Sequence, residues 1–385
     1  MKKIILTSSL AAALFLFSGC DSEDKKESTD TTPTVEDVVP EKETVLTPSL
    51  DPKNEQYYKY LWHIDSENSK NNSISQKVSN YYEGQYEIGQ IDENADINIL
   101  DAWKITRGKD VIVAVIDDGA DIEHEDLKAN IHLAYNADDD TSDVSNHSSD
   151  IKHASHGNTC AGFIVAPVNE IGTIGTAPEA KIIIIKQNDD SDSHTLRAFE
   201  YAKNHGAKVI SCSWGTGYIS EALQEELKSM YDSGITVLFA SGNDNKDLDK
   251  IGVEDESESP WVIGVGASGE NNKQTPYSNY GKYIDILAPG GDASNSTGIL
   301  GIDDTGTQGS VENYGLVSNN YAFTNGTSFS TPVAAGVVAL MYSVNPNITP
   351  AQVRDILIDT SVDIGSTIKK IDATAAVKKA QELNN

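Results

Sequence analysis

Three polar side chains of this chain have the types and settings that nucleophilic catalysis needs. Ser328 lies between Gly326-Thr327 and a long apolar helical pattern, where the N–H groups at a helix start could stabilise an oxyanion. A serine in such a place is more often only a helix cap. Asp117 follows an apolar strand pattern, and His156 opens an Ala/Gly-rich helical pattern. An acid, a base and a hydroxyl, each at the end of a regular element, together indicate a hydrolytic triad.

Alternating strand and helix patterns must position these residues. Apolar strand patterns cover residues 111–116, 181–186, 209–212 and 236–240, and helix patterns cover residues 195–205, 220–231 and 328–344. A further helix is predicted to begin at Thr349, with Pro350 in its first position and Gln352 completing a capping box. The alternation predicts an α/β fold in three layers, a mostly parallel central sheet with helices on both faces. Catalytic groups collect at the carboxyl ends of the strands in such sheets.

Four sequence blocks resemble the signature blocks of the subtilases, the subtilisin-like serine peptidases. These blocks are VAVIDDG, HGNTCAG, FASGND and GTSFSTP, and the similarity runs from about residue 62 to about residue 361. The order Asp, His, Ser along the chain is the one known for subtilisin. The resemblance implies a subtilisin-like fold, with Asp117, His156 and Ser328 as the triad and the side chain of Asn243 as an oxyanion donor.

The resemblance also implies a serine endopeptidase that hydrolyses extended protein segments through an acyl-enzyme. At neutral pH, His156 can accept the Ser328 proton and return it to the leaving amine. Asp117 would orient the imidazole and stabilise its cationic form. The alternative is a binding lipoprotein that keeps the fold without turnover. Since such a scaffold need not retain every triad member, the sequence favours activity.

Several details are similar to the kexin-like branch of the family, which prefers basic residues before the cleaved bond. The segment SCSWG would hold the substrate backbone through Ser213 and Gly215, with Trp214 at the pocket wall. Asp118 stands where those enzymes keep an acid for the second basic residue. No acid occurs at residues 216–218, where the kexin-like pattern has one, and an acidic chain has carboxylates near any cleft. The other acids that could add negative potential are Asp189, Asp190 and Glu254.

Three segments, DINILDAW, HEDL and VNEIGTIG, resemble the pieces of the family's high-affinity calcium site. Calcium takes about six to eight oxygen ligands in a flexible geometry, which a loop rich in main-chain carbonyls can supply. The alternative is a merely solvated acidic surface. The acids at residues 138–143 are a second, weaker candidate because acids in exposed loops usually face water. The ligands that the resemblance implies are the side chains of Asp96, Asp126 and Asn169 and the carbonyls of Ala166, Ile171 and Thr173.

The amino terminus has the pattern of a lipoprotein signal. Residues 1–20 join MKK to an apolar run and then SGC, so Cys20 would be the lipidation site. A transmembrane span fits less well, because the apolar run is short and ends at charged residues. Residues 21–55 are rich in Ser, Thr, Asp, Glu, Lys and Pro, which predicts a disordered acidic tether. Residues 56–385 would then form a peptidase domain in the bacterial cell envelope, held to a membrane by lipid but extracytoplasmic.

The composition restricts the partners. A formal net charge of -30 argues against nucleic acid or an anionic membrane surface, because both would repel the chain. Protein or peptide substrates are consistent with this charge, and we expect a monomer. Cys160 and Cys212 permit at most one internal bridge, and both lie in apolar segments, which favours buried free thiols.

Overall fold

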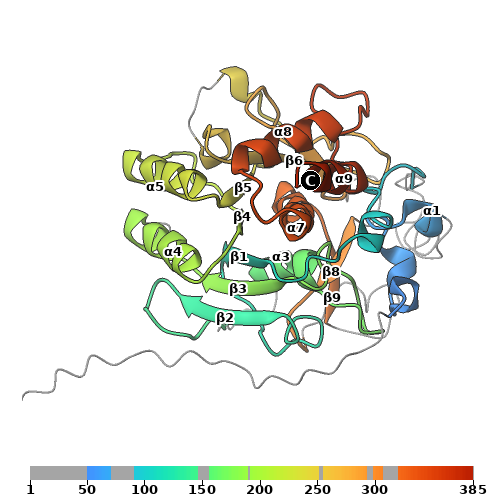
Figure 1. Ribbon diagram of the computed structural model, residues 1–385, viewed down its shortest axis with the longest axis horizontal. Helices are drawn as coiled ribbons and strands as arrows, with labels where there is room; N and C mark the ends of the chain where they lie inside the picture. The colour runs from blue at the N-terminus through green and yellow to red at the C-terminus, as the bar shows by residue number, and fades with distance from the viewer. Residues whose placement is uncertain are drawn as a thin grey trace, which may run out of the picture. The chain divides into compact units, whose positions relative to one another are not determined.

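A parallel sheet forms the centre of the protein. The computed structural model describes residues 50–70, 91–145, 156–189, 191–250, 255–292, 298–306 and 320–384, all within one compact unit, Asp37–Asn385. Seven parallel strands follow the order β2-β3-β1-β4-β5-β6-β7 (Figure 1). They are β1 Ile112–Asp117, β2 Ile131–Asn136, β3 Lys181–Lys186, β4 Val209–Cys212, β5 Thr236–Ala240, β6 Ile263–Ser268 and β7 Ile286–Pro289. The predicted α/β class is therefore confirmed.

Strand β1 lies inside the sheet, between β3 and β4. Its side chains alternate between two apolar cores, as the period of a strand requires. Val113 and Val115 belong to one core, and Ala114 and Ile116 belong to the other. A strand that is buried on both faces has a nearly continuous run of apolar residues in its sequence. The first polar residue of β1 is Asp117, which is thereby placed at the carboxyl edge of the sheet.

Helices cover both faces of the sheet, which confirms the predicted three layers (Figure 1). The core on one face includes side chains of α4 (Asp192–Asn204) and α5 (Glu221–Asp232). The core on the other face is built from α3 (His156–Val165) and α7 (Thr327–Val344). The remaining elements are the short helices η1 Pro52–Asn54, η2 Tyr58–Tyr60, α1 Ser66–Ser69, η3 Ala102–Lys104, η4 Leu248–Lys250 and η5 Glu256–Glu258, the antiparallel pair β8 Ile299–Ile302 and β9 Tyr321–Thr324, and α8 Pro350–Thr360 and α9 Ala373–Glu382.

Helix α7 is apolar all round because it crosses the interior. Among the described helices it alone has the length and hydropathy of a membrane span, yet 83% of it is buried inside the domain. Its Gly336 permits a very close approach, since a Cβ there would lie 1.7 Å from Thr176 Oγ1. A helix that is hydrophobic on every side is expected in the core of a large domain.

The sequence predicts most of these boundaries closely. Helix α8 begins at Pro350, and both hydrogen bonds of the Thr349 capping box are present, as predicted. Helix α4 begins at Asp192, three residues before the predicted start at 195. The predicted tether is wrong at its carboxyl end, because η1 belongs to the folded domain and Glu55 is only 4% exposed. Cys20 lies outside the described residues.

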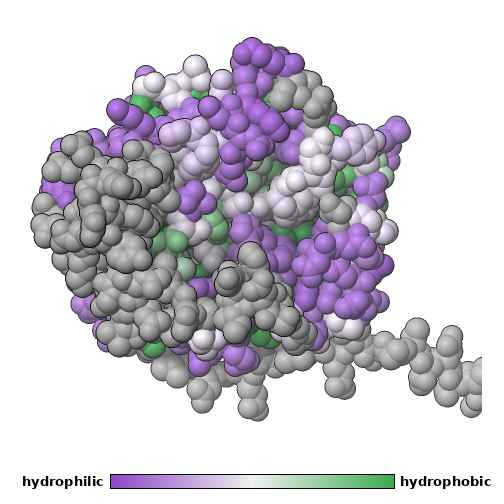
Figure 2. Space-filling model, turned by 180° about the vertical axis from the view of Figure 1, so that it is seen from behind, coloured by the Kyte–Doolittle hydropathy of each residue, from purple (hydrophilic) through white to green (hydrophobic). Residues whose placement is uncertain are grey.

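Figure 2 shows a face on which hydrophilic residues predominate, with smaller hydrophobic areas between them. Cys160 and Cys212 are both buried and unbridged, as predicted. Burial raises the pKa of both thiols, so neither is a ready nucleophile at neutral pH.

Candidate active site

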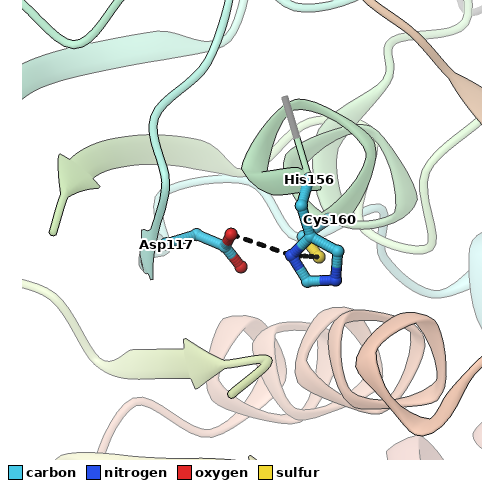
Figure 3. A group of neighbouring side chains, drawn as sticks. All are labelled: Asp117, His156 and Cys160. Carbon is cyan, nitrogen blue, oxygen red and sulfur yellow. Dashed lines mark hydrogen bonds and ion pairs between the residues drawn. The ribbon is translucent and has the colours of Figure 1, made fainter. Parts of the chain in front are cut away.

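Asp117 and His156 form the centre of the site. Asp117 is the last residue of β1 and His156 is the first residue of α3, and His156 Nδ1 lies 2.8 Å from Asp117 Oδ1 (Figure 3). Burial alone would lower the pKa of His156, but the charge of Asp117 and its hydrogen bond outweigh burial and hold that pKa well above 6.5. Burial would likewise raise the pKa of Asp117, and the pairing with His156 keeps it below 3.8. The pair therefore joins an ionised carboxylate to a readily protonated imidazole.

Asp118 fixes the helix that carries His156. Its two carboxylate oxygens accept the backbone N–H groups of His156 (3.1 Å) and Gly157 (2.8 Å), so it caps α3 from a distant strand end. Glycine is needed at 157, since a Cβ there would lie 2.4 Å from the Gly119 carbonyl oxygen and 2.8 Å from Asp117 Cβ. The predicted contact of Asp118 with substrate remains a prediction, whereas its cap on α3 was not predicted.

Ser328 lies in the first turn of α7, beside this pair. Its hydroxyl donates to the Ser213 carbonyl (3.0 Å), so its proton is directed at Ser213 rather than at His156. The sulfur of Cys160 lies between His156 and Ser328, 3.8 Å from His156 Nδ1 and 3.5 Å from the Ser328 carbonyl oxygen. The Phe329 ring packs 5.2 Å from the imidazole. Among the described residues Ser328 and His156 share no hydrogen bond, and such catalytic bonds often form only when substrate is present.

Asn243, which follows β5, has its side chain held in one orientation. Its Oδ1 accepts both the N–H (2.9 Å) and the hydroxyl (3.0 Å) of Thr327. The amide NH₂ donates to no group among the described residues, and Asn243 and Ser328 border one hollow of about 380 Å³. The neighbouring Gly326 has a φ of 147°, a backbone conformation that favours glycine.

The predicted substrate-binding segment borders the same hollow. Ser213, Trp214 and Gly215 all line it. The Trp214 indole donates to the Ile116 carbonyl (2.9 Å), which ties the pocket wall to the strand that ends in Asp117. The structure thus brings the predicted catalytic and backbone-binding residues together.

The acids nearest to the hollow are not the ones that the sequence analysis selected. Asp244 and Lys246 line it and pair with each other (3.1 Å). Asp255 and Glu258 also line it, and Asp255 Oδ2 accepts the Gly217 N–H (3.2 Å). Their spacing is that of a capping box, which they form at η5, and this signal could have identified them. Asp189 is exposed and lies 3.4 Å from His194 Nδ1, and it does not line this hollow. Asp190 and Glu254 lie outside the described residues.

Residues 108–382 match the model of the Subtilase family, Peptidase S8. The chain belongs to the subtilase family. A calcium-dependent protease of Trichormus variabilis is 33% identical over 306 residues, which cover 71% of this chain and 45% of that protein. A subtilisin of Bacillus pumilus is 32% identical over 264 residues, which cover 68% of this chain and 86% of that protein. This subtilase therefore spans less than half the length of the first relative.

Solved structures agree with the family. A protease from Pseudoalteromonas arctica superposes with a TM-score of 0.67 at 26% identity, covering 85% of this chain and 99% of that one. A lanthipeptide protease superposes with a TM-score of 0.65 at 23% identity, covering 86% of this chain and 98% of that one. The second likeness concerns the fold alone.

Part of the predicted cation site of this subtilase is present. Asn169 Nδ2 donates to Asp126 Oδ1 (3.0 Å), and the Thr173 N–H donates to Asp126 Oδ2 (2.8 Å). The Ile171 N–H in turn donates to Asn169 Oδ1 (2.9 Å). The Ala166 carbonyl accepts the Gly175 N–H (2.9 Å), so that oxygen already has one partner. The buried carboxylate of Asp126 therefore contacts Asn169 and Thr173, and Ile171 contacts Asn169 in turn.

Asp96 does not join this group, and its predicted role is wrong. Its carboxylate accepts the N–H (2.9 Å) and hydroxyl (2.6 Å) of Ser66 and the N–H of Asn98 (2.8 Å), in a separate acidic hollow. The carboxylate that reaches the loop is Glu55, whose Oε1 accepts the N–H groups of Asn169 (2.6 Å) and Glu170 (2.8 Å). Glu55 was not predicted as a ligand, because it lies in the segment assigned to the tether.

Glu55 and Asp126 together fit a hard cation. Glu55 Oε2 is buried and has no hydrogen-bond partner among the described residues. Burial raises the pKa of Glu55 to about 7 and that of Asp126 to about 8, and the charge of Glu55 adds to the shift of Asp126. Carboxylate oxygens are ligands that Ca²⁺ prefers, and the unpaired Glu55 Oε2 is the oxygen that such an ion could bind without displacing a hydrogen bond.

Proposed function

We propose that this subtilase is a serine endopeptidase that cleaves extended protein segments through an acyl-enzyme. The observation that carries the proposal is the 2.8 Å hydrogen bond between His156 Nδ1 and Asp117 Oδ1, beside the helix turn that presents Ser328. Because Nδ1 is bound to the carboxylate, Nε2 is the ring nitrogen left to act on Ser328. Peptide hydrolysis by a serine hydroxyl needs a base oriented in this way.

Each residue of the site has a separate role in the proposed hydrolysis. His156 removes the Ser328 proton as Oγ attacks the substrate carbonyl carbon, and Asp117 stabilises the imidazolium that forms. The Ser328 N–H and the Asn243 amide donate to the oxyanion, with Asn243 held ready by Thr327. His156 then gives its proton to the leaving amine. Water next attacks the carbonyl carbon of the acyl-enzyme, with His156 taking the water proton and returning it to Ser328 Oγ. No reorientation of Asn243 is needed, because its oxygen is already engaged.

The substrate chain would lie along residues 213–215, with a basic side chain favoured in the hollow beside Ser328. Asp255 and Glu258 line that hollow and supply the negative charge that residues 216–218 lack. Asp118 borders a second hollow, together with Asp117 and Trp214, where a further basic residue could be placed. Attraction between these carboxylates and a cationic side chain strengthens as water is excluded.

A calcium ion would be held by Glu55, Asp126, Asn169 and main-chain carbonyls of the loop that contains Ile171 and Thr173. The bound ion would neutralise two buried carboxylates and tie the segment of Glu55 to this loop. It would act on stability and would take no part in the chemistry of Ser328. A relative named as a calcium-dependent protease supports this assignment.

Lipid attached to Cys20 would hold the enzyme at a membrane of the bacterial cell envelope. Residues 1–49 lie outside the described part of the chain, so this proposal rests on the sequence pattern alone. A tether of several dozen residues would leave the domain in solution, where it could act as a monomer on exported proteins.

The function is tested by labelling with a fluorophosphonate, which phosphonylates activated serines. We expect stoichiometric labelling of the wild-type protein at Ser328, and no labelling of Ser328→Ala or after prior reaction with a serine-peptidase inhibitor. The Ser328→Ala protein should unfold at the wild-type temperature, which shows that the fold is intact. A correctly folded wild-type protein that remains unlabelled would instead support a binding protein without turnover.

Cleavage of a peptide library tests the basic preference. We expect arginine or lysine to be enriched directly before the cleaved bond. Asp255→Asn keeps the cap of η5 and removes a charge, so kcat/KM for such peptides should fall by roughly tenfold, with little effect on neutral peptides. Asp189→Asn, which changes an exposed acid away from the hollow, is the matched control. A neutral preference in the wild-type protein would contradict the proposal.

Thermal unfolding in the presence of EGTA tests the calcium site. In the Ser328→Ala background, which prevents self-digestion, we expect calcium to raise the Tm, because binding at a roughly hundredfold excess over Kd adds about 2.7 kcal/mol to the free energy of unfolding. Glu55→Gln should abolish most of this calcium-dependent shift, whereas Asp96→Asn should leave it unchanged. If Asp96→Asn abolishes the shift and Glu55→Gln does not, the assignment of Glu55 is wrong.

A further inference from the structure

The first turn of α7 contains a proline at a position that affects Ser328. In an α-helix the carbonyl of residue 328 would accept the N–H of residue 332. That residue is Pro332, which has no N–H and lies inside the helix. The carbonyl oxygen of Ser328 therefore lacks the N–H donor that residue 332 would supply in an ordinary helix. Other groups must donate to this oxygen.

Two side chains from other elements donate to this carbonyl. Ser213 Oγ lies 2.6 Å from the Ser328 carbonyl oxygen, which is a short O–H···O hydrogen bond. Cys160 Sγ lies 3.5 Å from the same oxygen and is a much weaker donor. Ser213 follows β4 and is only 5% exposed, so its hydroxyl is withdrawn from solvent.

The two serines are bound to each other in both directions. The Ser213 hydroxyl donates to the Ser328 carbonyl, and the Ser328 hydroxyl donates to the Ser213 carbonyl (3.0 Å). One bond holds the backbone of Ser328, and the other holds its side chain. When the Ser328 hydroxyl turns to His156, the second bond is lost, and the Ser213 hydroxyl remains the strong donor to the backbone carbonyl, beside the weaker Cys160 thiol.

We propose that Ser213 is a positioning residue for the nucleophile, its hydroxyl replacing the helical hydrogen bond that Pro332 denies to the carbonyl of Ser328. The inference rests on Ser328 being the nucleophile, as in the proposed function. Holding this carbonyl fixes the Cα of Ser328, and with it the reach of Oγ toward substrate and the direction of the Ser328 N–H. Reacting atoms must approach to about 3–3.5 Å, so a small displacement of the nucleophile slows the reaction greatly. The Ser213 hydroxyl itself does not touch the reacting atoms.

Ser213→Ala tests this role. We expect kcat for peptide hydrolysis to fall about tenfold, which corresponds to the loss of one hydrogen bond, while KM stays within about twofold. The rate constant for labelling by a small fluorophosphonate should fall by the same factor. Such a probe has no peptide chain to lie along residues 213–215, so its slower reaction reports on the nucleophile and not on substrate binding.

Ser211→Ala is the matched control. Ser211 lies in the same strand region and is fully buried, and its hydroxyl has no hydrogen-bond partner among the described residues. The same chemical change at 211 should therefore leave both rates within about twofold. Ser213→Thr keeps the donor and should restore most of the rate. If its extra methyl group distorts the protein, as a lowered Tm would show, Ser213→Cys should give a rate between those of alanine and serine.

The outcomes separate the two proposals. If the wild-type protein is not labelled, Ser328 is not an activated nucleophile, and the proposed function fails together with this inference. If the wild-type protein is labelled and Ser213→Ala reacts at the same rate, only the role of Ser213 is overturned. That role is also overturned if Ser213→Ala and Ser211→Ala slow the reaction equally, because the effect would then belong to any buried hydroxyl of this segment.

Discussion

The hydrogen bond between His156 and Asp117 joins the end of a buried strand to the start of a helix, and the geometry of the site depends on it. Strand β1 lies inside the sheet, so the position of Asp117 is set by its neighbours β3 and β4. Asp118 caps α3 and sets the position of His156. The pair is therefore oriented by the backbone of the core rather than by mobile surface side chains, as preorganised catalysis requires.

Carboxylates near the site mostly serve the backbone. Asp118 caps α3, Asp255 caps η5, and Glu256, buried in the same short helix, accepts the N–H and hydroxyl of Thr216. Glu55 binds two N–H groups of the loop at Asn169. A net charge of -30 thus accompanies a set of acids that hold loops in place. Of the acids near the site, Asp255 and Glu258 line the hollow beside Ser328, and they are the basis of the proposed preference for basic substrates.

Much of the fold and of the site could be predicted from the sequence, and the exceptions have physical reasons. Apolar runs and helix caps are local signals, so β3, α8 and the setting of Asp117, His156 and Ser328 were predicted well. Contacts between distant segments carry no local signal. Asp96 and Glu55 are both acids in polar surroundings, and only the packing of η1 against the loop at Asn169 decides between them. The bond from Ser213 to the Ser328 carbonyl is equally non-local, although Pro332 marks the place where a donor is missing.

The pKa of His156 tests the account most directly. A histidine NMR titration of the Ser328→Ala protein, with His156 assigned by its loss in His156→Gln, measures this pKa without self-digestion. The account predicts a pKa above 6.5, because Asp117 outweighs the effect of burial, and a lower value in Asp117→Asn. A pKa at or below 6.5, or one that Asp117→Asn leaves unchanged, would show that the carboxylate does not stabilise the imidazolium and would contradict the account.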